Sequence, residues 1–392
     1  MKNEQELRKI EVGNKEYNAL TTDEMSEVLS FKIFDKPMKE LKYLLCTNYI
    51  HDQLLKENLT RTGLYQWINV FRGEVKAPRD VLDYNDYDIV QVNMSGQDIH
   101  LVGTIREQLK EQSTTKLVLN NDYTTELWGV SFDWPDTIAR EVVHADMLFG
   151  TEYFQTTALT ELSGRECYVI PHPAYVKRLK HLPKIENKEI ITTIWRRYDA
   201  HSYIPSLAVR NHGITTQLIG YDISKDRKPY VTTTLYDYVF AGTNYFEFCN
   251  QMRESKIVYN PFTFHSYDRT TVDCAAMGVA MVTSNRTQSS NICYPHTCVD
   301  PFDVKKSREM INKLNNDKDF YDLVVKTAQE KSEFYNHSNS KLRYFTALYE
   351  SLKKGRIPSR NIKRKKELVR GVGDDALSLS SKSIERKNEK KN

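Results

Sequence analysis

The fold class is indicated most clearly by residues 256–286, KIVYNPFTFHSYDRTTVDCAAMGVAMVTSNR. Residues 256–259 and 279–282 are short apolar runs of strand length. Between them, residues 269–277 have the composition of a helix, and Gly278 is suited to end it because glycine adopts positive φ without steric cost. Strand, helix and strand in this order predict a parallel βαβ unit.

The same alternation extends through most of the chain. Strand-length apolar runs precede the stretch at residues 43–46, 89–92, 116–119, 147–149, 168–170, 190–195, 217–219 and 235–240. Helix-period stretches lie at residues 99–111, 137–143, 204–209 and 305–352. We therefore expect an α/β protein with two doubly wound Rossmann-like domains facing across a cleft, where such sheets bind ligands.

Changes in composition predict the domain boundaries. Pro171-His172-Pro173 ends the first series of strands, and a charged stretch follows it. We expect a charged helical extension at 1–38, a first Rossmann-like domain at 39–176, a linker at 177–189, a second such domain at 190–317, C-terminal helices at 318–352 and a basic disordered tail at 353–392. Within the extension, Thr22 or Asp23 is expected to cap a helix through residues 25–31.

Composition excludes several classes of protein. Hydrophobic residues make up 40% of the 392, which excludes a wholly disordered chain. No stretch approaches the roughly 20 apolar residues that span a bilayer, and the N-terminus is too polar for a signal peptide. The six cysteines lack a CxxC motif, so we expect reduced thiols without structural zinc. A soluble, cytoplasmic protein is expected.

The net charge of +4 is unevenly distributed. Residues 353–392 hold 14 Lys and Arg against 5 Asp and Glu, a charge of +9, which leaves −5 for the rest of the chain. The tail has no aromatic residue, and its run at residues 363–366, Lys-Arg-Lys-Lys, can attract nucleic acid or an anionic membrane surface. A solvated tail that only aids solubility is the alternative.

Other phosphate-binding or metal-binding motifs are missing or misplaced. The chain has neither GxxxxGK[ST] nor GxGxxG, which argues against a P-loop NTPase and a standard dinucleotide enzyme. Asp86-Tyr87-Asp88 precedes a strand, so we interpret it as a turn and expect no metal site there. The predicted helix at 269–277 offers free N–H groups to a phosphate, and Asp273 lies one turn inside it, where a carboxylate can bind a ribose diol.

The run VDCAAMGVAMVTSN at residues 272–285 resembles the donor-site signature of GT-B-fold glycosyltransferases, of the retaining family 4 or glycosyl transferases group 1 type. Asp273 stands at the carboxylate position of that signature, and Ala276 and Gly278 match it. Ala280 replaces the usual proline, and His265 replaces a glutamate eight residues before Asp273. Weaker matches follow in order: YDIVQVN at 87–93, LVLNND at 117–122, residues 145–151, IPHP at 170–173 and WRR at 195–197.

The resemblance implies a donor site, mainly in the second domain. Arg196 or Arg197 would neutralise the diphosphate, and Asp273 would hold the ribose. Thr270, in the first turn of the helix, and Gly63, after the first strand, are the further donor-binding candidates. No metal and no cofactor are expected beyond a UDP- or GDP-linked sugar as cosubstrate.

Two catalytic candidates follow from the same resemblance. Asp122, at a strand end, would be the base if the enzyme inverts, whereas a retaining enzyme needs no strong base. His265 stands at the sugar-contacting position. Helix capping explains Asp122 equally well, and a plain turn explains Gly63.

The predicted function is transfer of a sugar from a nucleotide sugar to an acceptor hydroxyl. The basic tail suggests a polyanionic acceptor, such as a hydroxymethylated base in DNA, although a lipid or polymer at an anionic membrane explains the tail as well. The alternatives are an epimerase or hydrolase of nucleotide sugars on the same fold and a non-catalytic nucleic-acid-binding protein.

Overall fold

The computed structural model of the protein describes residues 20–48, 63–94, 98, 100–122, 124, 126, 134–183, 185, 188–194, 203–210, 213–220, 236–241 and 245–355. Three predicted features lie outside these residues. They are the start of the N-terminal extension (1–19), the donor-binding candidates Arg196 and Arg197, and the basic tail from residue 356 onward.

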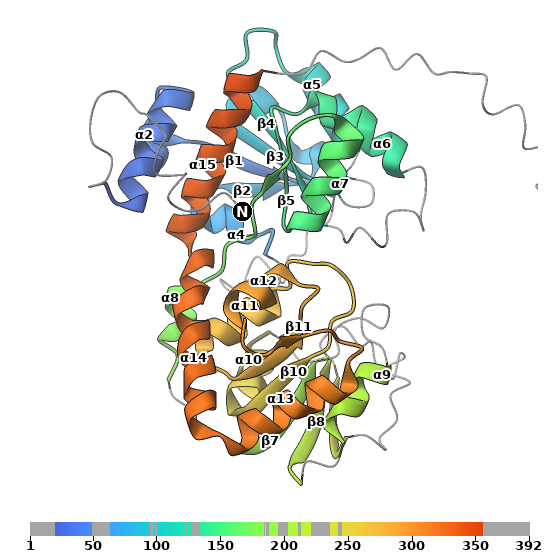
Figure 1. The fold of residues 1–392 in the computed structure, drawn as a ribbon. Coiled ribbons are helices and arrows are strands. Elements are labelled where there is room, and N and C mark those ends of the chain that lie inside the picture. Colours follow the sequence, from blue (N-terminus) through green and yellow to red (C-terminus); the bar gives the residue numbers. More distant parts are fainter. Residues whose placement is uncertain are drawn as a thin grey trace, which may run out of the picture. The chain divides into compact units, whose positions relative to one another are not determined.

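Six parallel strands form the first sheet, in the order β2-β1-β3-β4-β5-β6 (Figure 1). Their bounds are Tyr43–Cys46 (β1), Glu74–Lys76 (β2), Ile89–Asn93 (β3), Lys116–Asn121 (β4), Met147–Gly150 (β5) and Tyr168–Val169 (β6). The five apolar runs predicted in this half are confirmed as strands. The strand order reverses between β1 and β3, which is the switch point where such sheets bind ligands.

Helices cover both faces of the first sheet. Side chains of α5 (Leu101–Gln108), α6 (Trp134–Glu141) and α7 (Tyr153–Ser163) share one buried cluster with Leu44 and Val90. Those of α2 (Thr22–Phe34), α4 (Gln66–Phe71) and α15 (His337–Lys354) share another with Tyr43 and Leu45. Neighbouring strand residues point to opposite faces, and both faces are buried, so the central strands are largely apolar in sequence.

The second sheet is also parallel, in the order β12-β11-β10-β7-β8-β9. Its strands are Lys188–Ile194 (β7), Thr215–Gly220 (β8), Tyr238–Ala241 (β9), Ser255–Asn260 (β10), Met281–Ser284 (β11) and Cys298–Val299 (β12). Its helices are Tyr203–Ser206 (α9), Tyr245–Glu254 (α10), Arg269–Met277 (α11), Gln288–Cys293 (α12), Val304–Asn316 (α13) and Lys318–Ser332 (α14). The switch point lies between β7 and β10.

Short 3-10 helices complete the described secondary structure: Met38–Glu40 (η2), Pro78–Asp80 (η3), Tyr84–Asp86 (η4), Val142–His144 (η7), Leu207–Val209 (η8) and Glu333–Tyr335 (η9). The turn predicted at residues 86–88 therefore overlaps η4 at Asp86 and ends before β3. All six cysteines are free thiols, and all but Cys298 are buried.

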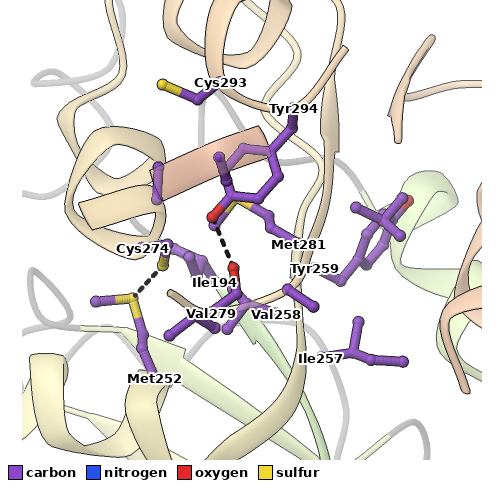
Figure 2. Close-up of a cluster of buried hydrophobic side chains, with 14 of the residues drawn as sticks. Ile194, Met252, Ile257, Val258, Tyr259, Cys274, Val279, Met281, Cys293 and Tyr294 are labelled. Atoms are coloured by element: carbon purple, nitrogen blue, oxygen red, sulfur yellow. Dashed lines mark hydrogen bonds between the residues drawn. The ribbon is translucent and has the colours of Figure 1, made fainter. Parts of the chain in front are cut away.

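Figure 2 shows the core of the second sheet, which α10, α11 and α12 help to build. The hydroxyl of Tyr294 donates to the carbonyl of Val279 at 2.7 Å, so the polar atom of this buried ring has a partner. Cys274 Sγ lies 3.3 Å from Met252 Sδ. The predicted helix at 269–277 is confirmed residue for residue, and Gly278 ends it at φ 73°.

Two predicted details differ from the structure. Thr21, and not Thr22 or Asp23, caps α2, because its hydroxyl accepts the Glu24 N–H while the Glu24 carboxylate accepts the Thr21 N–H in a capping box. The range interpreted as a linker, 177–189, contains most of α8 (Val176–Lys180) and the start of β7. Val176 and Leu179 of α8 are buried in the core of the second sheet, which gives this charged stretch its helix.

Candidate functional site

Polar side chains follow the carboxyl ends of β4 and β6 in the first sheet. Asp122 comes directly after β4, and His172 lies three residues after β6, between Pro171 and Pro173. Proline fixes φ and also restricts the residue before it, so the backbone around His172 is stiff. Because α/β sheets bind ligands at the carboxyl ends of their strands, these side chains are where the site is expected.

Four residues form what we call the histidine cluster: Gly63, Trp67, Asp122 and His172. His172 Nδ1 accepts the indole N–H of Trp67 at 3.0 Å, and its Nε2 lies 3.2 Å from Asp122 Oδ1. The His172 side chain is 1% exposed, whereas that of Asp122 is 34% exposed. A Cβ on Gly63 would lie 2.5 Å from His172 Cβ, so only glycine fits beside this ring. The candidates Gly63 and Asp122 therefore meet at a histidine that was not predicted as a site residue.

The loop at residues 261–268, between β10 and α11, contacts the first domain. The ring of Tyr267 packs edge to face on that of His172, with 5.8 Å between centroids. His265 stacks on Phe154 of α7 at 4.5 Å, and its Nδ1 lies 2.6 Å from Glu126 Oε1. The same Glu126 oxygen accepts the His265 backbone N–H at 2.8 Å. This loop thus joins strand-end residues of both sheets.

A second carboxylate lies close to this contact. Glu152 is buried and caps α7, accepting the N–H groups of Phe154 and Gln155 at 2.6 Å each. Burial raises the pKa of Glu152, while these two hydrogen bonds and the nearby His265 oppose the rise by favouring the charged form. Two carboxylates, those of Glu126 and Glu152, thus lie near His265.

The donor candidates on α11 are buried. Thr270 is 4% exposed and Asp273 is 1% exposed. The Tyr245 hydroxyl donates to Asp273 Oδ2 at 2.7 Å, and Arg269 Nε lies 3.4 Å from the same carboxylate. Burial alone would lower the pKa of Arg269, but Asp273 and Tyr245 outweigh it and the net direction is upward. Both Asp273 oxygens thus have protein partners, and its role toward a ribose stays a prediction.

The backbone turns sharply where α11 begins. Asp268, which precedes the helix, has φ 49° and is buried. A positive φ at a non-glycine residue costs about 1–3 kcal/mol and persists where the surroundings enforce it. Here the Asp268 carboxylate accepts from Asn260 Nδ2 and Thr271 Oγ1, each at 2.5 Å, and its carbonyl accepts from Ser289 Oγ at 2.9 Å. These bonds hold the start of α11 in one orientation.

The structure sorts the seven candidates into four groups. Gly63 and Asp122 lie in the histidine cluster, His265 contacts the first domain, Thr270 and Asp273 are buried in α11, and Arg196 and Arg197 lie outside the described residues. Sequence reasoning missed His172, Glu126 and Arg269. The Pro-His-Pro motif was a signal for the first, but nothing in the sequence pairs the other two with their partners.

The residues that the structure describes contain no group of three or more His, Cys, Asp or Glu side chains placed to hold a metal ion. Among them, no helix has the length and apolarity needed to cross a bilayer.

No family model matches the chain, and no curated protein matches it significantly.

The fold, by contrast, matches many solved structures. HepE of Anabaena in complex with UDP and glucose superposes with a TM-score of 0.59 at 13% identity, covering 80% of this chain and 100% of its own. The Escherichia coli trehalose-6-phosphate structure bound with UDP-2-fluoro glucose gives 0.58 at 10% identity, covering 79% and 99%. A UDP-forming α,α-trehalose-phosphate synthase from Burkholderia xenovorans gives 0.53 at 12%, covering 75% and 81%. The predicted fold is confirmed: two Rossmann-like domains in the GT-B arrangement.

Proposed function

We propose that this protein is a glycosyltransferase that moves a sugar from a nucleotide-sugar donor to an acceptor hydroxyl. Proteins with the same fold have been solved with UDP and glucose and with UDP-2-fluoro glucose, which supports a ligand of this class. The observation that carries the proposal is the contact of loop 261–268 with Glu126 and with His172, whose Nε2 lies 3.2 Å from Asp122 Oδ1. It gathers hydroxyl-binding and charged groups at the strand ends of both sheets, where a transfer reaction needs its two substrates.

We assign the nucleotide and diphosphate of the donor to the second domain. Arg196 and Arg197 follow β7, and guanidinium groups bind phosphate oxygens in a fork geometry. The start of α11, with Thr270, would add backbone N–H groups and the positive end of the helix dipole. A UDP- or GDP-linked sugar fits such a site without a metal, because these groups carry the charge of the leaving diphosphate.

We assign the acceptor to the first domain, with Asp122 next to the reacting hydroxyl. If the reaction inverts the anomeric centre, Asp122 would remove the proton of the acceptor hydroxyl as general base. If it retains, the departing phosphate can take that proton, and Asp122 would orient the hydroxyl by accepting its hydrogen bond. In both cases His265 would face the transferred sugar.

A thermal-shift screen over UDP- and GDP-sugars tests the donor assignment. A ligand at 100 times its Kd stabilises the folded protein by about 2.7 kcal/mol, which raises the unfolding temperature measurably. We expect Arg196→Ala and Arg197→Ala to reduce that rise, while Arg79→Ala leaves it unchanged, because the Arg79 side chain is 85% exposed and salt-bridged only to its neighbour Asp80 among the described residues. If no nucleotide sugar shifts the transition, the proposal is wrong.

Product analysis separates transfer from the alternative chemistries. With a donor labelled in the sugar, a transferase moves the label to an added acceptor, a hydrolase releases free sugar, and an epimerase returns a changed nucleotide sugar. Label recovered only as free sugar or as epimer, whatever the acceptor, would replace the proposal with one of these alternatives.

For the acceptor, we propose a polyanion held by the basic tail, with DNA that carries hydroxymethylated bases as the first example to test. A base in a duplex would have to leave the stack to react, as it does in other base-modifying enzymes. We expect deletion of residues 356–392 to weaken DNA binding and to flatten its dependence on salt. Unchanged DNA binding would contradict this, and binding to anionic vesicles instead would favour a lipid acceptor.

A further inference from the structure

The ring nitrogens of His172 have different partners. Nδ1 accepts the Trp67 indole N–H at 3.0 Å, and an indole nitrogen can only donate, so Nδ1 carries a lone pair. In the neutral ring the proton must then be on Nε2. Within the described residues Nε2 makes no aligned hydrogen bond, although it is buried and lies 3.2 Å from Asp122 Oδ1. The contact with Asp122 is therefore electrostatic, between an N–H dipole and a carboxylate.

We propose that His172 is a positioning residue for sugar transfer: with its tautomer fixed by Trp67, it places Nε2–H beside Asp122, and this electrostatic contact favours the orientation of the carboxylate that faces the acceptor hydroxyl. The inference rests on the proposed role of Asp122. The His172 side chain is 1% exposed, which leaves it too buried to contact a substrate, whereas the 34% exposed Asp122 can reach a ligand.

Packing leaves the ring little freedom to turn. Gly63 lies against one side so closely that a Cβ there would be 2.5 Å from His172 Cβ. Tyr267 packs edge to face on the ring, and prolines on either side restrict the backbone. A ring held in this way keeps Nε2 directed at the same place. Tyr267 also precedes Asp268 and α11, so the ring contacts the segment that leads into the proposed donor helix.

A core histidine with a purely structural role is the simpler alternative. NMR tests the tautomer on which the proposal depends, and the kinetics of matched variants separate the two roles. In protein labelled with ¹⁵N-histidine, we expect the neutral ring of His172 to show the Nε2–H tautomer, with the resonance assigned by its loss in His172→Gln. In Trp67→Phe the indole donor is gone, and we expect a change toward mixed tautomers. An Nδ1–H tautomer in the wild-type protein would overturn the inference without any measurement of activity.

Kinetics of matched variants test the link to Asp122. Glutamine at position 172 offers one acceptor for Trp67 and one N–H for Asp122, whereas leucine offers neither. We expect His172→Leu to lower kcat about 100-fold, the scale of a small misplacement of a reacting group, with donor KM and donor-induced thermal shift unchanged. His172→Gln should recover most of that loss, and His181→Gln, at an exposed histidine, should have no effect. Equal losses in the Gln and Leu variants at equal unfolding temperatures would overturn the inference.

A double-mutant cycle tests whether Trp67 acts through His172. We expect Trp67→Phe alone to lower kcat. The same change in a His172→Leu background should lower it no further, because the contact from Trp67 to Asp122 through His172 is already lost. Additive losses would overturn the inference. A wild-type protein that binds the donor but transfers no sugar would instead contradict the proposed function, and the NMR result would still decide how Trp67 holds His172.

Discussion

The buried ion pair of Arg269 and Asp273 determines how mutations on α11 must be interpreted. Both side chains are less than 5% exposed, and Tyr245 joins them through the Asp273 carboxylate. We expect Asp273→Asn to lower the free energy of unfolding by about 3–5 kcal/mol, because it leaves the Arg269 charge buried without its partner. Urea denaturation measures this. A loss of donor binding in this variant therefore demonstrates a ribose contact only if the protein remains folded.

A paired replacement provides the control for that prediction. Arg269→Met together with Asp273→Leu removes both charges and keeps apolar volume, so we expect it to recover most of the lost stability. If Asp273→Asn proves as stable as the wild type, the ion pair does not stabilise α11.

Gly63 is constrained by the ring of His172. We expect Gly63→Ala to lower the free energy of unfolding by about 1–3 kcal/mol, because the new Cβ would overlap His172 Cβ and force the ring or the backbone to move. Gly103→Ala in α5 is the matched control: its Cβ would meet the flexible end of Glu141 at 3.2 Å and the His144 ring at ordinary contact distance, 3.4 Å, and alanine favours a helix. Thermal unfolding of the two variants in parallel checks the contrast, and equal stabilities would contradict it.

The role of a single residue was predictable where the local backbone conformation alone requires that residue type. Gly278 was expected to end the helix at 269–277, and it does so at φ 73°. Arg269 was not foreseen, because an arginine in a helix is ordinarily solvated, and its burial depends on Tyr245 from another helix. His172 was missed for a similar reason: the Pro-His-Pro motif predicts a stiff turn, but its partners Trp67 and Asp122 come from distant parts of the chain.

At the scale of elements, buried strands were easier to predict than edge strands. The central strands β1, β3 and β4 are largely apolar in sequence, because both their faces are buried. Edge strand β2 is Glu-Val-Lys, and β12 has two residues, so neither carries an apolar run. Helix α7, Tyr153–Ser163, was not predicted because its residues are mixed in polarity and its cap is a glutamate.

His337, the first residue of α15, makes the attachment of that helix sensitive to acid. Burial, with the nearby charges of Arg269 and Lys341, lowers the pKa of His337 to about 4 from its ordinary 6.5. The unfolded chain therefore binds a proton first, so stability is complete above about pH 6.5 and falls as the pH drops toward 4. We expect a loss of about 2 kcal/mol between pH 7 and pH 5 from this residue.

The difference between wild type and His337→Gln isolates that contribution. Urea denaturation at several pH values should show a shallower decline below pH 6.5 for the variant, because glutamine does not titrate. His181→Gln, at an exposed histidine, should follow the wild type. Parallel curves for wild type and His337→Gln would show that His337 is protonated equally in both states.

In the whole molecule, the C-terminal helix α15 packs on the first sheet together with α2 and α4 from the N-terminal part of the chain (Figure 1). Tyr344 and Phe345 are fully buried there, and Ser351 Oγ donates to the carbonyl of Asp146 at 2.6 Å. The sequence predicted helices near residues 305–352 but gave no indication of which sheet they cover. An amphipathic helix fits any apolar face, so only the tertiary structure decides its position.

Because α15 completes the core of the first sheet, we predict that the first domain does not fold stably from its own contiguous segment of the chain. In a chain of residues 20–175 alone, the face that receives Tyr344 and Phe345 would be exposed to water, and we expect no cooperative unfolding transition. Residues 175 and 336 lie close together, because the backbone N–H of Ala174 donates to the carbonyl of Tyr335 at 2.8 Å. A short linker can therefore join the two segments. Joining residues 20–175 to residues 336–355 through a short Gly-Ser linker should restore a cooperative transition in urea. The same joined chain with Tyr344→Ala and Phe345→Ala should not show it, since each truncation of a buried aromatic ring costs about 3–5 kcal/mol. Cooperative unfolding of residues 20–175 alone, at the midpoint of the joined chain, would mean that α15 contributes nothing to the first domain.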